Sequence, residues 1–213
     1  GSKEVDDVNR GWFVGKDISA IWDHEFIGIW QEDEAEEAAK YGQQPGDAKV
    51  RDVNGDYKIT QEDKVFLGQE TPKFRWSFRN EFTLFRNWDI SLNLYSQMGH
   101  KQSTTEYLNF FDNLGDYSNT YKREYWTPEN KSRPSNINPK KVINKGFIRL
   151  ENISVSYRVP QQFARKLMAK EISIYGTVRN VAVWAFDKEW DYWDPETKGL
   201  LPRTFTFGAS ITF

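Results

Sequence analysis

Residues 204–213 constrain the fold of this chain more than any other segment. Apolar residues stand at every second place, and small or polar residues stand between them: Phe205, Phe207, Ala209, Ile211 and Phe213 alternate with Thr204, Thr206, Gly208, Ser210 and Thr212. Successive side chains of a β-strand point to opposite faces, so this alternation puts every apolar residue on one face. The pattern predicts an amphipathic strand that ends on an aromatic residue.

Four further segments alternate in the same way, namely 74–84, 88–95, 147–159 and 172–186. They are about ten or more residues long, as a tilted strand must be to cross a bilayer, whereas soluble strands usually have about 5–6 residues. The alternation slips between Leu150 and Ile153, which predicts a bulge or the membrane edge there. Residues 18–30 alternate poorly, although we expect a sixth strand in that region.

The composition narrows the protein class without deciding it. Aromatic residues make up 16% of the 213 residues, with nine Trp, while the mean hydropathy is only -0.77. Transmembrane β-barrels combine these properties because one strand face meets lipid and the other lines a polar interior. An aromatic-rich, carbohydrate-binding β-sandwich would combine them too. A net charge of -2 argues against a nucleic-acid-binding surface, and the chain shows no catalytic motif. We therefore expect neither a nucleic-acid partner nor an enzyme.

The connections between the predicted strands alternate in length. Residues 85–87 form a tight turn and residues 160–170 a moderate one, with one or two helical turns expected at 161–169. Residues 31–72, 100–146 and 187–203 are long and polar, and residues 32–40 read as a short acidic helix. Short turns on one side and long loops on the other are typical of outer-membrane barrels. In such a barrel, four charged residues of the strands would face the interior: Arg75, Arg79, Glu81 and Arg179.

Residues 52–63 have the spacing of an EF-hand-like calcium loop. Tyr57 stands where the sharp turn of that loop favours Gly, and the twelfth position is Asp rather than Glu. Two interpretations stay open, a Ca²⁺ site that stiffens a long exterior loop and an Asx-rich turn that satisfies its own backbone amides. The predicted ligands are Asp52, Asn54, Asp56, Lys58 (through its carbonyl oxygen), Thr60 and Asp63.

Aromatic residues gather in the long loops. Rings in such places stack on sugars, contact a partner or hold the loop together. We favour loop packing or partner contact for these rings. Five residues are the candidate ligand or partner contacts: Tyr125, Trp126, Trp190, Tyr192 and Trp193.

Several short motifs follow one another from about residue 26 to the C-terminus. They read QPGD at 44–47, DVNGD at 52–56, YWTPEN at 125–130, GFIRLENI at 146–153, DPE at 194–196 and PRTF at 202–205. In this order they resemble motifs of the SusC/RagA-type TonB-dependent transporters of Bacteroidetes outer membranes. Any one of these matches alone is weak, but together they are highly specific.

The resemblance implies an all-β fold, an antiparallel transmembrane β-barrel of 22 strands. This chain would supply about the last six, so residues 1–213 would be the C-terminal part of the barrel. The plug domain and the N-terminal strands would lie outside the chain. Residues 31–72, 100–146 and 187–203 would be extracellular loops, and Phe213 would be periplasmic. The barrel assembly signal would comprise Phe205, Phe207, Ile211 and Phe213.

The resemblance also implies uptake of an oligosaccharide or a peptide across the outer membrane of a Gram-negative bacterium. The implied partners are the rest of the barrel and its plug, a SusD-like surface lipoprotein, the lipid bilayer, and the TonB–ExbB–ExbD system acting through the plug. The alternative is a soluble, aromatic-rich β-domain that binds carbohydrate. That alternative requires the apolar strand faces to pack against each other rather than against lipid.

Overall fold

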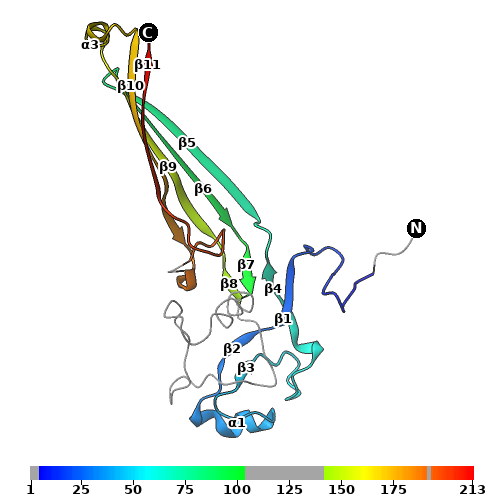
Figure 1. Cartoon of the computed structure of the whole chain (residues 1–213). Coiled ribbons are helices and arrows are strands. Elements are labelled where there is room, and N and C mark those ends of the chain that lie inside the picture. Colours follow the sequence, from blue (N-terminus) through cyan, green and yellow to red (C-terminus); the bar gives the residue numbers. More distant parts are fainter. Residues whose placement is uncertain (1–4, 104–141, 191–192) are drawn as a thin grey trace. The chain divides into compact units, whose positions relative to one another are not determined.

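The computed structural model describes residues 5–103, 142–190 and 193–213, and the chain divides into two compact units (Figure 1). Unit 1 comprises residues 1–71 and 100–144, and unit 2 comprises residues 72–99 and 145–213. Among the described residues, no helix is long and apolar enough to span a membrane.

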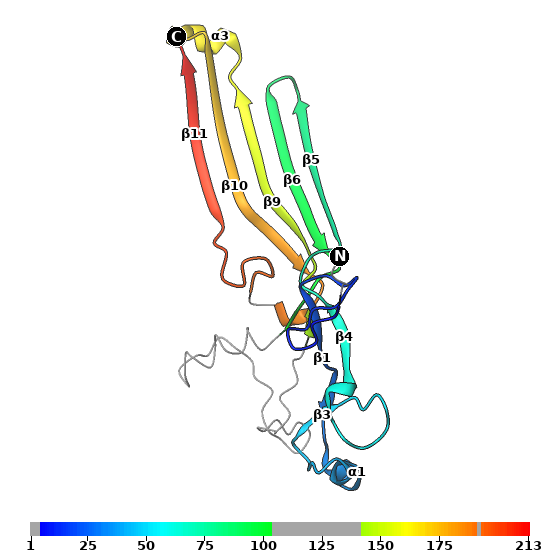
Figure 2. The same cartoon turned by 90° about the vertical axis from the view of Figure 1, so that its right-hand side faces the viewer.

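Unit 2 is built on one antiparallel sheet of five strands in the order β11-β10-β9-β6-β5 (Figure 2). The strands are β5 (Phe74–Leu84), β6 (Trp88–Met98), β9 (Phe147–Arg158), β10 (Glu171–Ala185) and β11 (Thr204–Thr212). Their lengths of 9 to 15 residues meet the roughly 9–11 that a tilted strand needs to cross a bilayer. The four segments with clear alternation and the terminal strand are thus confirmed as strands.

The pairing register carries the alternation from strand to strand. Phe78 lies opposite Leu94, Leu94 opposite Leu150, and Leu150 opposite Ala182. On the other face Glu81 lies opposite Ser91, and Ser91 opposite Ser154. One face of the sheet is therefore apolar across all five strands, and we call it the apolar face; the opposite face is the polar face. At the paired positions of these five strands, every Asp, Glu, Lys and Arg lies on the polar face.

The apolar face is largely exposed. Side chains along it keep much of their surface, for example Phe78 at 50%, Phe205 at 59% and Phe207 at 82%. Ala164, Ala169 and Ile172 form a buried hydrophobic cluster at the end of the sheet. An antiparallel sheet normally covers its apolar face with a second layer, and this one leaves it open.

The predicted slip in alternation is confirmed as a bulge. The register shifts between Asn93 and Leu94 on β6, where Glu151 of β9 is the extra residue, and between Arg179 and Ala182 on β10. The shift returns Leu150 to the apolar face and Arg149 to the polar face. The bulge therefore keeps the faces separate where the simple alternation of the sequence fails.

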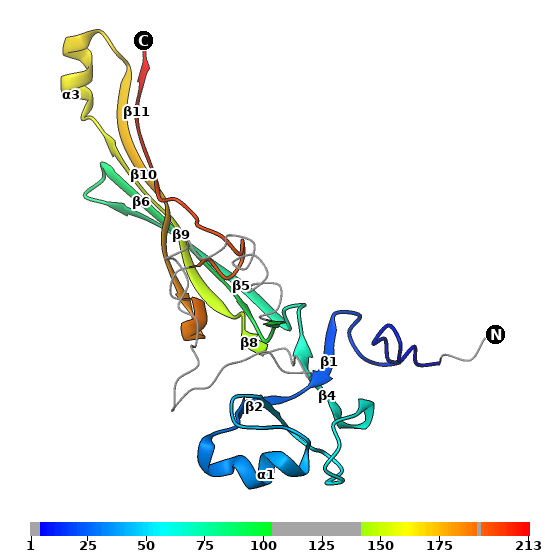
Figure 3. The same cartoon turned by 60° about the horizontal axis from the view of Figure 1, so that its bottom comes forward.

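The short connections lie at one end of the sheet. Residues 85–87 join β5 to β6, and the helical turns α3 (Gln161–Ala164) and η4 (Arg165–Leu167) join β9 to β10 beside the C-terminus (Figure 3). Lys170 Nζ donates a hydrogen bond of 2.8 Å to the Phe213 carbonyl oxygen. The helical turns predicted at 161–169 are thus confirmed, and they include Arg165 and Lys166.

Unit 1 consists of short elements. Three strand pairs occur in its described part: β1 (Ala20–His24) with β4 (Lys64–Gln69), β2 (Phe26–Ile29) with β3 (Ala48–Val50), and β7 (Lys101–Ser103) with β8 (Val142–Asn144). The predicted acidic helix is confirmed as η1 (Glu32–Glu34) and α1 (Ala35–Lys40), and η2 (Gln61–Asp63) precedes β4. Residues 18–30, where one long strand was expected, instead form β1 and β2.

Candidate functional site

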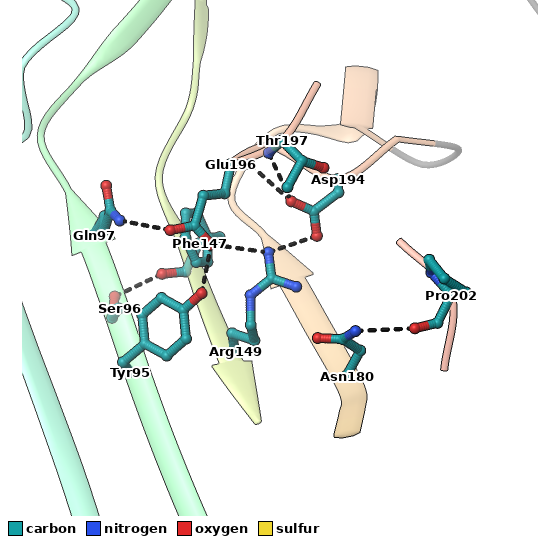
Figure 4. Close-up of polar contacts among 10 residues, drawn as sticks. All are labelled: Tyr95, Ser96, Gln97, Phe147, Arg149, Asn180, Asp194, Glu196, Thr197 and Pro202. Carbon is teal, nitrogen blue, oxygen red and sulfur yellow. Dashed lines mark hydrogen bonds and ion pairs between the residues drawn. The ribbon is translucent and has the colours of Figure 1, made fainter. Parts of the chain in front are cut away.

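Arg149 is a buried cation on the polar face of β9. The residue is only 2% exposed. Its Nη2 atom donates a hydrogen bond of 2.5 Å to Asp194 Oδ2 (Figure 4). The guanidinium carbon lies 5.2 Å from the centre of the Phe147 ring and 5.7 Å from that of Tyr95. A buried guanidinium is tolerated where a carboxylate and aromatic faces offset its lost hydration.

Glu196 brings a second carboxylate to the same place. Its Oε2 atom lies 3.4 Å from Arg149 Nη2 and accepts a hydrogen bond from the Tyr95 hydroxyl, while Gln97 Nε2 donates to Oε1 at 3.0 Å. Tyr95 and Gln97 are both on the polar face of β6. One carboxylate from the β10–β11 connection is therefore bonded to two neighbouring strands.

Asp194 organises the turn that carries Glu196. Its Oδ1 atom accepts hydrogen bonds from the backbone N–H groups of Glu196 and Thr197, both at 3.0 Å. Its own N–H donates to the Gly199 carbonyl at 2.9 Å, and the Lys198 N–H donates to the Asp194 carbonyl at 2.9 Å. One carboxylate oxygen thus shapes the turn, and the other anchors it to Arg149.

The same connection is attached a second time, at the bulge of β10. Asn180 has a φ of 54°, a left-handed conformation that Asn tolerates better than most residues, and its Nδ2 donates to the Pro202 carbonyl at 2.9 Å. Arg203 Nη2 donates to the Val181 carbonyl at 2.7 Å. We call residues 194–203, which run between these two attachments, the strap.

A cavity of about 510 Å³ lies beside the strap at the end of β10. Its volume is in the range of small-molecule pockets. Trp190, one of the predicted contact residues, lines this cavity and is only 3% exposed. The lining residues are Val183, Trp184, Ala185, Phe186, Asp187, Lys188, Trp190, Trp193, Asp194, Gly199, Leu200 and Leu201.

The predicted calcium loop of unit 1 folds around its own acidic side chains. Asp52 accepts hydrogen bonds from the N–H groups of Gly55 (2.7 Å) and Tyr57 (3.0 Å), and Asp56 accepts one from Lys58 (2.8 Å). Each oxygen of a carboxylate has two lone pairs, so these bonds leave capacity for a cation. Among the described residues, no three His, Cys, Asp or Glu side chains gather closely enough to hold a metal ion by themselves. A cation here would also need Asn54 and carbonyl oxygens, as EF-hand loops use.

Tyr57 adopts the conformation that the loop requires despite not being glycine. Its φ is 62°, in the left-handed region, at the sixth position, where EF-hand loops turn sharply. Its ring lies 5.4 Å from that of Tyr41, and the Tyr41 hydroxyl is 3.4 Å from Asp52 Oδ2. Packing of the side chain therefore helps to hold a residue type that rarely takes this conformation.

Asp63 joins the two ends of the loop through hydrogen bonds to its buried carboxylate. It is fully buried, and its carboxylate accepts hydrogen bonds from the N–H groups of Val53 (3.0 Å) and Thr60 (2.8 Å). Burial works to raise the pKa of Asp63, but the backbone hydrogen bonds outweigh it and lower the pKa below the usual value. Because the pKa is lowered in the folded state, the stability from this carboxylate is present above about pH 3.9 and is lost as pH falls through the folded pKa.

The other predicted site residues separate into three groups. Tyr125, Trp126 and Tyr192 lie outside the described residues. The four members of the predicted assembly signal are exposed, from 52% for Ile211 to 82% for Phe207. Arg75, Arg79, Glu81 and Arg179 lie on the polar face by their register. The roles predicted for the candidate contact residues and for the assembly signal stay predictions.

The Arg149 cluster was not predicted as a site, although several of its residues belong to motifs noted in the sequence. Arg149 lies in the GFIRLENI motif, Asp194 and Glu196 in the DPE motif, and Pro202 and Arg203 in the PRTF motif. The structure brings these three motifs together on unit 2 (Figure 4). Co-occurrence of the motifs was the available signal, but their mutual contacts depend on a pairing register that one sequence does not display.

Comparison with known proteins supports the resemblance. No protein-family model matches the chain. The chain is 25% identical over 236 residues to TonB-dependent receptor P26 of Formosa agariphila, covering 96% of this chain and 24% of the receptor. It is 23% identical to TonB-dependent receptor P3 of the same organism, covering 93% of this chain and 22% of the receptor. It thus spans about a quarter of the length of these curated relatives.

Solved structures give the same result for the fold. A chain of the RagAB peptide importer in the open-open state superposes with a TM-score of 0.61 at 15% identity, covering 91% of this chain and 22% of that chain. A second structure of the RagAB peptide transporter gives a TM-score of 0.60. The order of motifs, the strand arrangement and these similarities agree. Over nearly its whole length, the chain is similar to a segment of the SusC/RagA-type TonB-dependent receptors, as the sequence motifs had indicated.

Proposed function

We propose that this chain forms part of the barrel wall and exterior loops of a TonB-dependent transporter in a bacterial outer membrane. In this proposal the apolar face of unit 2 contacts lipid, and the polar face lines the aqueous interior. Residues outside this chain complete the barrel and provide the plug, because two open sheet edges cannot persist in hydrocarbon.

The observation that carries this proposal is the continuous, uncovered apolar face. Its paired positions bear no charge across the five strands of unit 2, while the polar face holds Arg75, Arg79 and Glu81 on β5 alone. A face this apolar is unfavourable in water, and lipid removes that cost without a second protein layer. The alternative, a soluble carbohydrate-binding sandwich, is disfavoured because Phe78, Phe205 and Phe207 are packed against no second sheet in the described part of the unit.

The cargo and partners follow from the similarity and not from a site in this chain. We propose an oligosaccharide or a peptide as cargo; the fold shared with a peptide importer supports the peptide option. A SusD-like lipoprotein would meet the long loops outside the membrane. The TonB–ExbB–ExbD system would act on the plug, so no residue of this chain is assigned to energy coupling.

The location of the full-length protein tests this proposal. We expect it to sediment with the outer membrane, to require detergent for extraction, and to migrate faster in unheated than in heated detergent gels, because a closed barrel resists unfolding until heated. Recovery of a stable monomer in buffer without detergent would contradict the proposal, since the apolar face would then have to be covered by protein.

We also propose that residues 52–63 bind Ca²⁺ and stiffen their loop. The left-handed turn at Tyr57 and the arrangement of Asp52 and Asp56 support this proposal. Calorimetric titration of the full-length protein is expected to give a Kd of about 10⁻⁴–10⁻³ M, as for extracellular calcium modules. The double variant Asp52→Asn/Asp56→Asn should lose the binding heat, whereas Glu36→Gln, an exposed carboxylate on α1, should keep it. Equal binding in both variants would assign the carboxylates to the turn alone.

A further inference from the structure

We infer that the strap is a fixed part of the passage wall that stays attached during transport, with Arg149 as its positioning residue. This inference rests on the proposed function, because it takes the polar face of unit 2 as the lining of the passage. It assigns to the connection between β10 and β11 a role other than that of a moving exterior gate.

The strap is attached to the strands on both sides of β9. Its first attachment joins Glu196 to Tyr95 and Gln97 of β6, and its second joins Pro202 to Asn180 of β10 (Figure 4). In the sheet order, β9 lies between β6 and β10. The strap therefore crosses β9 and occupies the polar side at the end of the sheet where the long connections leave.

A buried ion pair and a buried proline hold the strap in place. Arg149 is 2% exposed and Asp194 is 5% exposed, so their ion pair is shielded from water and salt. Detaching the strap would separate the guanidinium, which lies beside the Phe147 and Tyr95 rings, from its carboxylate. Detachment would therefore break a buried, charge-assisted hydrogen bond that water screens little, and this favours the attached state. Pro195 is among the fully buried side chains, which adds packing to the ion pair.

Of the two carboxylates of the strap, that of Glu196 remains accessible. The Glu196 side chain keeps 35% of its surface, whereas the Asp194 side chain keeps 4%. Arg149 thus places Glu196 at the surface of the polar face and Asp194 beneath it. A substrate moving along that face would meet a fixed segment on which the Glu196 side chain is accessible, and not a mobile loop.

Reversible cross-linking in the full-length protein tests whether the strap moves. The chain contains no cysteine, so Gln97→Cys and Glu196→Cys provide a unique thiol pair once any cysteines elsewhere are removed. A short reducible bis-methanethiosulfonate would join them. We expect uptake of the transported peptide or oligosaccharide to stay within about twofold after cross-linking. The matched pair Glu81→Cys/Ser91→Cys, directly opposite on β5 and β6, reports the effect of the reagent itself.

Cross-linking also tests the role of Arg149. Arg149→Met is expected to lower uptake per assembled molecule at least several-fold, and cross-linking positions 97 and 196 in that background should restore most of it. A loss of more than tenfold on cross-linking the otherwise unchanged protein, reversed by reduction, would overturn the inference and identify the strap as a gate. Failure of the cross-link to restore the Arg149→Met variant would overturn it too. Absence of uptake by the unmodified protein would instead count against the proposed function.

Discussion

Arg149→Met is expected to cost about 3–5 kcal/mol of the free energy that holds the strap on the sheet. The substitution removes the cation and leaves Asp194, which is 5% exposed, without a positive partner. Asp194 also shapes its own turn through the Glu196 and Thr197 N–H groups, so the turn should loosen along with the attachment. The destabilisation is local, because β9 and β10 keep their pairing.

Amide hydrogen exchange in the full-length protein measures this effect across residues 194–203. Arg149→Lys should give an intermediate result, because an ammonium keeps the charge but loses the planar contact with two rings. Arg158→Met is the matched control on the same strand: Arg158 pairs with Asp89 at 3.0 Å, but both side chains are more than 40% exposed. We expect that control to change stability by less than about 1 kcal/mol. If Arg149→Met and Arg158→Met changed the exchange rates equally, burial of the Arg149–Asp194 ion pair would not be the reason for its effect on the strap.

Arginine should destabilise the protein when placed on the apolar face of β6 and should be tolerated on the polar face. Leu92 lies between Asn80 and Ile153 on the apolar face, and Leu92→Arg is expected to destabilise the folded protein by about 2–4 kcal/mol if this position is near the bilayer midplane. Ser91 is the next residue and lies between Glu81 and Ser154 on the polar face. Ser91→Arg puts the same charge beside a carboxylate and, in the proposed barrel, in the aqueous interior, and should change stability little.

Urea unfolding of the full-length protein from lipid vesicles compares these two variants directly. Both variants carry arginine on the same strand, one position apart, so the size and charge of the new side chain are the same in both. Similar losses of unfolding free energy at the two positions would mean that both faces of β6 lie in the same environment.

The long strands were predictable because their alternation is local. The predicted segment 74–84 matches β5 at both ends, and the phase slip near Leu150 marks the bulge in the register. Both features depend on side chains at neighbouring positions of one strand. The helical turns at 161–169 and the acidic helix at 32–40 were predictable for the same reason.

The contacts of the strap were not predictable, because they join distant parts of the chain. Arg149 and Asp194 are 45 positions apart, and Tyr95 and Glu196 are 101 apart. Their meeting depends on the strand order and on the bulge, which decides that Arg149 lies on the polar face. The strand expected at 18–30 divided for a similar reason, because its two halves, β1 and β2, pair with different partners, β4 and β3.

The central claim is that the apolar face of unit 2 meets lipid and the polar face meets water. Nitroxide labels on single cysteines at positions 91 and 92, in the full-length protein in lipid vesicles, test it most directly. We predict that the label at position 92 is more accessible to oxygen, which concentrates in lipid, than to a water-soluble nickel chelate, and that the label at position 91 shows the reverse preference. Two labels with the same preference, or a label at position 92 that neither reagent reaches, would contradict the claim and favour a face covered by protein.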